Sequence, residues 1–151
     1  MNTIDISYDN DSYKTLAPRK AVLCYLNRVL EQVKLSNVEF SVSFIDEDRM
    51  HWINMEFRGI DDSTDILSFA AEDDDGFGFV SAGRRKRVLG DMLICPEVLR
   101  RNARNFSVSE DEELKRLLIH GVLHLSGKNH QSNEPSEPML IEQEEILSKL
   151  S

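Results

Sequence analysis

Hydrophobic and polar residues alternate along residues 3–8 and 38–44, which is the pattern of strands with one buried face, and residues 64–70 have little polarity, as expected of a strand inside a sheet. The alternation is clearest at residues 38–44, where every second residue is valine or phenylalanine. Because successive side chains of a strand point to opposite faces, this pattern predicts a sheet with its apolar face in the core. The four predicted strands are residues 3–8, 38–44, 64–70 and 88–95.

Apolar residues recur at helical spacing in five further segments. Pro18 and Pro96 suit the first turn of a helix, Asp46 suits an N-cap, and Ser109 with Glu112 has the spacing of a capping box. The predicted helices are residues 18–33, 46–57, 96–104, 109–126 and 139–150. This order predicts an α/β layered fold in a single domain, residues 1–151, with a mixed, mostly parallel sheet of about four strands and helices packed on it.

The composition is that of a soluble globular domain. The chain has 151 residues, of which 40% are hydrophobic and 30% charged. No apolar run approaches the length of a membrane span, and the first residues lack the pattern of a signal peptide. Cys24 and Cys95 lie far apart and have no metal-type spacing, so we expect buried free thiols. These features predict a cytoplasmic protein without a membrane partner.

The charge is unevenly distributed. The formal net charge is −9, yet residues 84–104 contain seven basic and two acidic side chains. A local basic face can hold phosphates on an acidic protein, because salt screens charges beyond about 8 Å. The cluster Arg84 to Arg87 therefore suits RNA backbone, but a solvated loop that balances the acidic residues 72–75 explains it equally well.

Three of the four histidines lie within eleven residues and have the spacing of a metal site. His120 and His124 are four residues apart, so on a helix they lie one turn apart on the same face. Gly127 follows, and glycine readily takes the left-handed backbone conformation that ends a helix. The resulting turn would bring His130 to the same ion. The fourth histidine, His51, has no such neighbours, and we expect it to be structural.

The spacing H-x-x-x-H-x-x-G-x-x-H is that of the metzincin zinc peptidases with one change. Those enzymes have a general-base glutamate directly after the first histidine, where this chain has Gly121. Three neutral imidazoles leave a fourth position open for water, as in catalytic zinc sites. The residues therefore predict a zinc-dependent hydrolase, with one Zn²⁺ per chain on His120, His124 and His130.

The same residues resemble the YbeY endoribonuclease family, whose pattern is close to H-G-x-L-H-L-x-G-x-D-H. Residues 120–130 match it except at Asn129, which replaces the usual aspartate. Residues 57–61, 64–69 and 89–92 are similar to the other blocks of that family, in the same order. The similarity therefore covers nearly the whole chain. Asn129 still forms hydrogen bonds, so we expect metal ligation to survive with altered metal affinity or water pKa.

The resemblance implies a metal-dependent, single-strand-specific endoribonuclease of ribosomal RNA maturation and ribosome quality control. Its partners would be single-stranded RNA, in particular ribosomal RNA, with the ribosomal subunit or ribosome-associated proteins. It assigns the metal to His120, His124 and His130 and a catalytic role to Arg58. The neighbours of Arg58 alone favour a different interpretation, a surface ion pair with Asp61 or Asp62.

Two other functions remain open for these residues. The metzincin spacing is compatible with a zinc peptidase or amidase, although Gly121 removes its base. A non-enzymatic, ribosome-associated zinc module is the second alternative. Asp65 and Asp91 lie beside predicted strands, where each carboxylate would either bond backbone or orient a ligand histidine.

Overall fold

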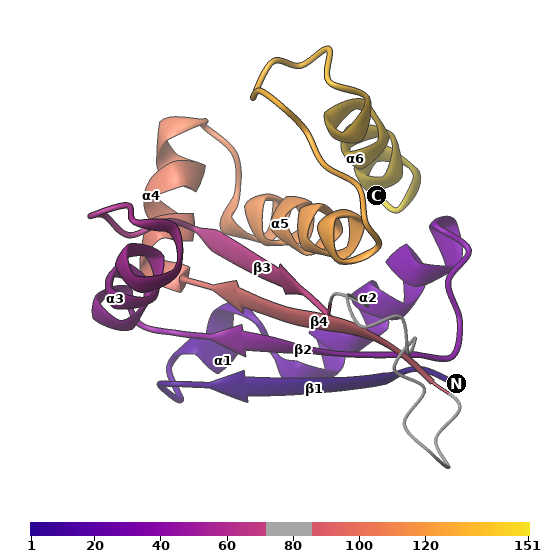
Figure 1. Cartoon of the computed structure of the whole chain (residues 1–151), viewed down its shortest axis with the longest axis horizontal. Coiled ribbons are helices and arrows are strands. Elements are labelled where there is room, and N and C mark those ends of the chain that lie inside the picture. Colours follow the sequence, from indigo (N-terminus) through magenta and orange to yellow (C-terminus); the bar gives the residue numbers. More distant parts are fainter. Residues whose placement is uncertain (72–85) are drawn as a thin grey trace.

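The computed structural model describes residues 1–71 and 86–151, and within these ranges it contains four strands and six helices (Figure 1). The strands are β1 (Thr3–Tyr8), β2 (Val38–Phe44), β3 (Ile66–Ala70) and β4 (Arg87–Ile94). The helices are α1 (Tyr13–Leu16), α2 (Arg19–Gln32), α3 (Glu47–Arg58), α4 (Pro96–Asn105), α5 (Glu110–Leu125) and α6 (Pro138–Lys149).

The four strands form one mixed sheet in the order β1-β2-β4-β3. β1 pairs with β2 and β2 with β4 in parallel, whereas β3 pairs with β4 in the antiparallel direction. The parallel pairs are joined by crossovers that contain helices, as parallel pairing requires. The predicted α/β fold with a mostly parallel sheet of four strands is therefore confirmed.

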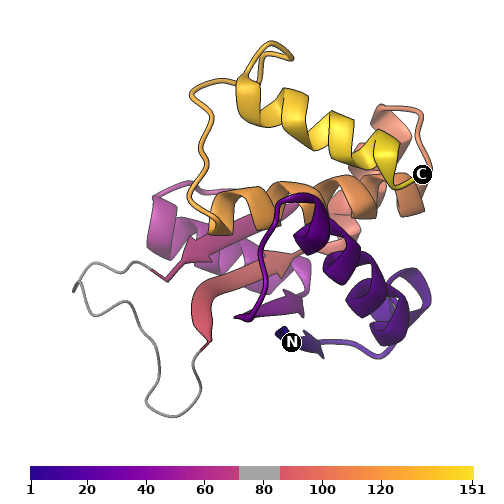
Figure 2. The same ribbon diagram turned by 90° about the vertical axis from the view of Figure 1, so that its right-hand side faces the viewer.

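The main core lies between one face of the sheet and α5. The apolar residues of β2 are fully buried, and its polar residues point to the half-exposed opposite face. α5 lies against β3 and β4, α2 packs beside α5, and α6 lies on the side of α5 away from the sheet (Figures 1 and 2). The elements thus form successive layers of sheet, α5 with α2, and α6.

Gly90 lies at an irregularity in the pairing of β4 with β2 and at a very close approach of β4 to β3. The register of β2 with β4 shifts between Glu39 and Phe40, and Gly90 adopts a φ of +133° beside this shift. A Cβ atom on Gly90 would lie 2.1 Å from the backbone oxygen of Phe69. Only glycine fits at this position, where β4 meets β3, the edge strand beside α5.

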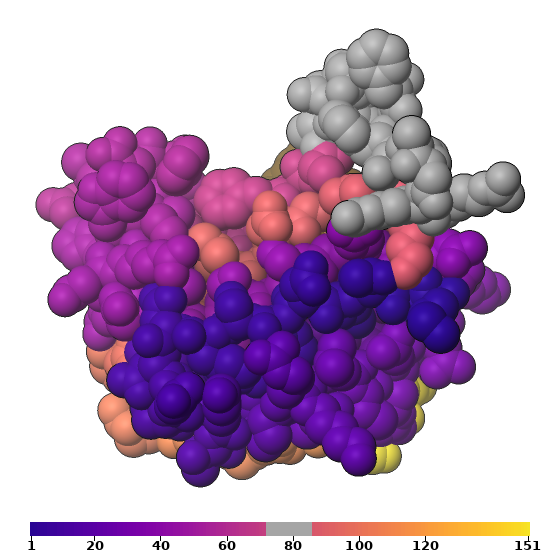
Figure 3. All heavy atoms as spheres, turned by 90° about the horizontal axis from the view of Figure 1, so that it is seen from below, coloured from indigo at the N-terminus to yellow at the C-terminus, as the bar shows by residue number. Residues whose placement is uncertain are grey.

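A second apolar cluster joins α3 and α4 to the end of the sheet. Asp46 caps α3 as predicted, because its side chain accepts a hydrogen bond of 2.8 Å from the backbone nitrogen of Arg49. The outer face of α3 carries the exposed side chains of Trp52, Met55 and Phe57. In the space-filling view from the β1 edge, the region of α3 projects at one end of the molecule (Figure 3).

Some expectations from the sequence require correction or lie outside the structure. Cys95 is buried as predicted, but Cys24 is exposed on α2, so that prediction is wrong for Cys24. Arg84, Arg85 and the acidic residues 72–75 lie outside the described residues. Lys86, which is described, donates a hydrogen bond to Thr3 Oγ1. No helix within the described ranges is long and apolar enough to cross a bilayer.

Candidate metal centre

Helix α5 places His120 and His124 on the same face, where both line one cleft. Ser109 caps the helix by accepting a hydrogen bond of 3.0 Å from the backbone nitrogen of Glu112. The leucine-rich stripe of the helix is buried against the sheet, which fixes its rotation. The two imidazole rings are consequently 4.6 Å apart between their centroids.

The turn at Gly127 returns the chain to the same face of α5, as the sequence predicts. Gly127 has a φ of +103°, and the backbone nitrogen of Lys128 donates a hydrogen bond of 3.0 Å to the oxygen of Leu123. This is the pattern in which a glycine ends a helix and reverses the chain. The ring of His130 then lies 5.3 Å from the rings of both His120 and His124.

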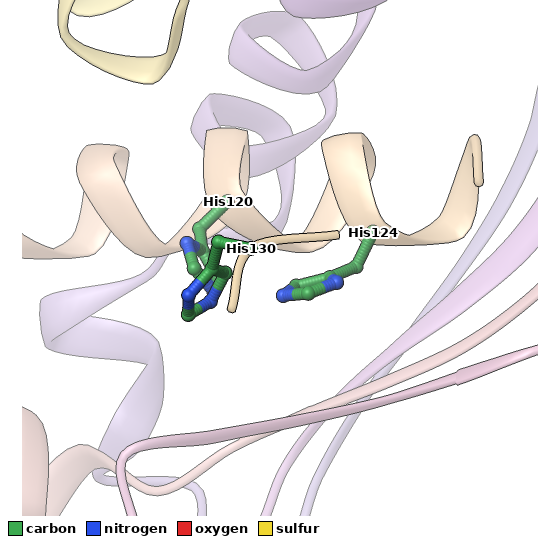
Figure 4. A group of neighbouring side chains, drawn as sticks. All are labelled: His120, His124 and His130. Atoms are coloured by element: carbon green, nitrogen blue, oxygen red, sulfur yellow. The ribbon is translucent and has the colours of Figure 1, made fainter. Parts of the chain in front are cut away.

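The three histidines converge on one point below α5 (Figure 4). Their ligand nitrogens all lie within 4.8 Å of one another, so one metal ion can contact all three. Three nitrogens from side chains of this kind suit zinc and other divalent transition metals. The cluster is half-buried, so a fourth ligand position can remain accessible from outside.

Hydrogen bonds to two of the rings determine which ring nitrogen is left to bind a metal. The Nδ1 of His130 is 2.7 Å from the carbonyl oxygen of Ser132, which can only accept. The Nδ1 of His120 is 2.7 Å from Oε1 of Gln143, which is likewise an acceptor. Both rings therefore have a proton on Nδ1, and in the neutral form of each ring Nε2 keeps a lone pair for a metal.

The environment also favours the neutral forms of His120 and His124, which metal binding requires. Burial lowers the pKa of His120 and the neighbouring His130 lowers it further, whereas the hydrogen bond with Gln143 acts in the opposite direction. Burial, together with His120 and His130, lowers the pKa of His124 to about 4. Hydrogen bonds with Lys128 backbone and the Asn129 side chain act on His124 in the opposite direction. His120 and His124 are therefore unprotonated at neutral pH.

The cluster lies in a cleft of about 1030 Å³ between β3, α4, α5 and α6. Polar and apolar side chains both line this cleft, and Arg58 and several amides line it together with the histidines. The lining comprises Arg58, Thr64, Asp65, Ile66, Leu67, Ser68, Phe69, Asn102, Phe106, Arg116, Leu117, His120, His124, Asn129, His130, Asn133, Leu140 and Gln143.

Arg58 is the last residue of α3 and reaches this cleft. Gly59 follows with a φ of +69°, which turns the chain and presents the arginine at the cleft wall. Asp61 pairs with His51 instead, at 2.7 Å between Oδ1 and Nε2, and His51 lies outside the histidine cluster. Within residues 1–71 and 86–151 Arg58 forms no ion pair, which removes the surface-pair interpretation.

Neither aspartate considered from the sequence forms a hydrogen bond or ion pair with a ligand histidine in the described structure. Asp65 accepts a hydrogen bond of 3.1 Å from Asn102 Nδ2 in the cleft wall, and burial raises its pKa. Asp91 accepts one of 2.6 Å from Ser41 on the neighbouring strand. The side chain that orients His120 is Gln143 of α6, which sequence reasoning missed.

Gly121 allows α5 to lie directly on β4. A Cβ atom at residue 121 would be 2.3 Å from Cε and 2.6 Å from Sδ of Met92, which is fully buried. A side chain at the position of the peptidase glutamate would therefore enter the core. This contact explains the glycine in terms of packing, independently of the chemistry of the cleft.

We expect Gly121→Ala to destabilise the fold by about 1 kcal/mol, because overpacking costs roughly 1–3 kcal/mol and the helix propensity of alanine returns about 1. In a Met92→Ala background the sign should reverse, since the clashing atoms are gone. Urea unfolding of the parent protein, the two single variants and the double variant measures both effects. Stabilisation by Gly121→Ala alone would contradict the tight contact.

Fold and site together define a single-domain α/β protein with a three-histidine cluster, suited to a metal ion, in an open cleft. The family model described as Endoribonuclease YbeY matches residues 4–151. The chain therefore belongs to the YbeY endoribonuclease family, as its sequence motifs indicate.

Relatives from several bacteria support this assignment. The Endoribonuclease YbeY of Treponema denticola is 37% identical over 146 residues, which cover 97% of this chain and 92% of the relative. The corresponding protein of a Sulfurihydrogenibium species is 32% identical and is covered to the same extent. A solution structure of a Thermotoga maritima protein superposes with a TM-score of 0.65 at 26% identity, covering 98% of this chain and 89% of that one.

Proposed function

We propose that this protein is a zinc-dependent, single-strand-specific endoribonuclease that acts in ribosomal RNA maturation and ribosome quality control in the cytoplasm. The observation that carries the proposal is the convergence of His120, His124 and His130 within 4.8 Å in an open cleft. Membership of an endoribonuclease family supplies the substrate class, RNA. Ribosomal RNA, and contact with the ribosomal subunit or ribosome-associated proteins, extend this proposal through the family resemblance.

The donor set fits zinc. His120 and His130 each donate a hydrogen bond from Nδ1, so the neutral form of each ring has its Nε2 lone pair free for a metal, and the lowered pKa of His124 keeps that ring neutral. A zinc ion bound here would polarise a phosphoryl oxygen and activate a water molecule. The cleft of about 1030 Å³ leaves room for substrate beside the histidines.

Arg58 supplies the second source of positive charge. Its guanidinium is free of ion pairs within the described part of the chain and borders the histidine cleft. Phosphodiester cleavage builds up negative charge on the phosphoryl oxygens, and arginine can bind two of them through parallel N–H groups. We infer that Arg58 binds the scissile phosphate and stabilises the charge that develops on it.

The structure favours a nuclease over the alternative of a peptidase or amidase. A metzincin-type peptidase needs a carboxylate beside the metal to carry a proton to the leaving amine. Residue 121, which bears that carboxylate in peptidases, is a glycine packed on Met92. Phosphodiester cleavage depends more on charge neutralisation, which the histidine site and Arg58 can provide.

The purified protein is therefore expected to cut labelled unstructured RNA, to cut duplex RNA poorly and to leave unfolded casein intact. A flexible single strand can enter a cleft between helix and sheet edge, whereas a rigid duplex cannot bend into it. Gel analysis of the three substrates with one preparation measures this preference, and chelation should stop the RNA cleavage.

The His124→Ala variant, purified in parallel, controls for contaminating nucleases. Casein digestion that requires zinc and His124, with RNA left intact, would overturn the nuclease assignment. A preference for duplex RNA would overturn the single-strand specificity alone. Cleavage of RNA by both proteins to the same extent would show that the activity does not belong to this site.

A further inference from the structure

The ring of His120 is held by a side chain from a different helix, α6. Gln143 is 7% exposed, and its Oε1 lies 2.7 Å from His120 Nδ1. The other end of its amide, Nε2, donates a hydrogen bond of 3.0 Å to Glu144 Oε2. A carboxylate only accepts hydrogen bonds, so this second contact requires that the amide oxygen, and not its nitrogen, faces the histidine.

Glu144 is in turn fixed by Arg116 of α5. The Nε and Nη2 atoms of Arg116 donate hydrogen bonds of 2.9 and 3.1 Å to the two oxygens of Glu144. This two-point contact orients the carboxylate and lowers the pKa of Glu144. The ion pair also joins α5, which carries the histidines, to α6, which carries Gln143.

Arg116 itself has little freedom to move. It also donates hydrogen bonds to Glu113 Oε1 at 3.2 Å and to Glu112 Oε2 at 3.0 Å, one turn earlier in α5. The Glu113 side chain is only 4% exposed. A continuous series of hydrogen bonds therefore runs from the first turn of α5 through Arg116, Glu144 and Gln143 to Nδ1 of His120.

We propose that Gln143 is a positioning residue for the metal site: it selects the Nδ1–H tautomer of His120, and the Arg116–Glu144 pair keeps its amide in the required orientation. The inference deepens the proposed function, on which its metal-binding consequence rests. Without the acceptor, His120 would lose its preference for the Nδ1–H tautomer. The competing tautomer has its proton on Nε2, the nitrogen that must bind the ion.

Gln143→Met tests this inference, because methionine matches glutamine in length and helix propensity but offers only a weak acceptor. Nitrogen NMR of the metal-free proteins should show the Nδ1–H tautomer at His120 in the parent and its loss in Gln143→Met. Competition with a chelator should show zinc affinity reduced by about ten- to a hundredfold, the usual cost of removing such a partner.

Two further variants separate positioning from folding. Gln143→Glu keeps an acceptor for His120 and should retain the Nδ1–H tautomer. Glu144→Ala removes the carboxylate that orients the Gln143 amide and should weaken the preference of His120 for that tautomer. Glu145→Met places the same new side chain at an exposed position of α6 and should change neither readout. Thermal unfolding confirms that each protein is folded.

An unchanged tautomer and zinc affinity in folded Gln143→Met would overturn the inference. So would a parent protein whose His120 carries its proton on Nε2. A parent that has the Nδ1–H tautomer but binds no zinc would instead refute the proposed function and leave the positioning of His120 by Gln143 supported by the tautomer measurement.

Discussion

His124→Ala is expected to leave the protein folded but to reduce bound zinc from one ion per chain to almost none. His124 is half-buried and lies within a helix, and alanine has a high helix propensity, so the fold should survive the replacement of His124. Removing an outer partner of a metal ligand already costs about ten- to a hundredfold in affinity or activity. We therefore expect the loss of a direct ligand to lower RNA cleavage by at least about a hundredfold.

Elemental analysis of protein purified without added metal measures the first effect, and cleavage of labelled single-stranded RNA measures the second. His51→Ala is the matched control, because His51 pairs with Asp61 outside the cluster. It should keep both its zinc and its activity. Unchanged metal content in a His120→Ala, His124→Ala double variant would show that the ion binds elsewhere.

Arg58→Lys is expected to slow RNA cleavage by at least about tenfold, which corresponds to roughly 1.4 kcal/mol of transition-state stabilisation. Lysine keeps the positive charge but lacks the planar group that binds two phosphoryl oxygens together. The melting temperature should hardly change, because Arg58 is exposed and has no ion pair within the described residues to lose.

Arg49→Lys provides the comparison for this experiment. Arg49 lies on the same helix and pairs with Asp9 at 2.6 Å. It does not line the cleft of the described structure, and its replacement should leave the cleavage rate unaltered. Normal cleavage by Arg58→Lys would remove the catalytic role of Arg58, and so would a variant that loses activity only because it unfolds.

The sequence predicts the order of the main elements because each has a strong periodic pattern or a start signal. Strand β2, for example, has the predicted bounds, and its alternate residues are buried. The prediction misses α1, whose four residues are too few to show a helical period. It also starts β3 too early, since Thr64 and Asp65 precede the strand and Asp65 bonds Asn102 of α4.

The histidine cluster was accessible from the sequence because its spacing is local. Gln143 was not, because it lies 23 residues from His120 on another helix, and only tertiary packing brings them together. A signal was nevertheless present: Gln143 is a polar residue within the buried stripe of α6, between Met139 and Ile146. A lone amide at a core position of a helix indicates a specific buried partner.

The close spacing of the ligands along the chain also has a kinetic consequence for folding. His120 and His130 are ten residues apart, whereas the pairing of β2 with β4 joins Val42 to Met92, fifty residues away. Closing the shorter loop costs about 1.4 kcal/mol less chain entropy. The ligands can therefore meet once α5 and the turn at Gly127 have formed, before the sheet is complete, while the contact with Gln143 must await the docking of α6.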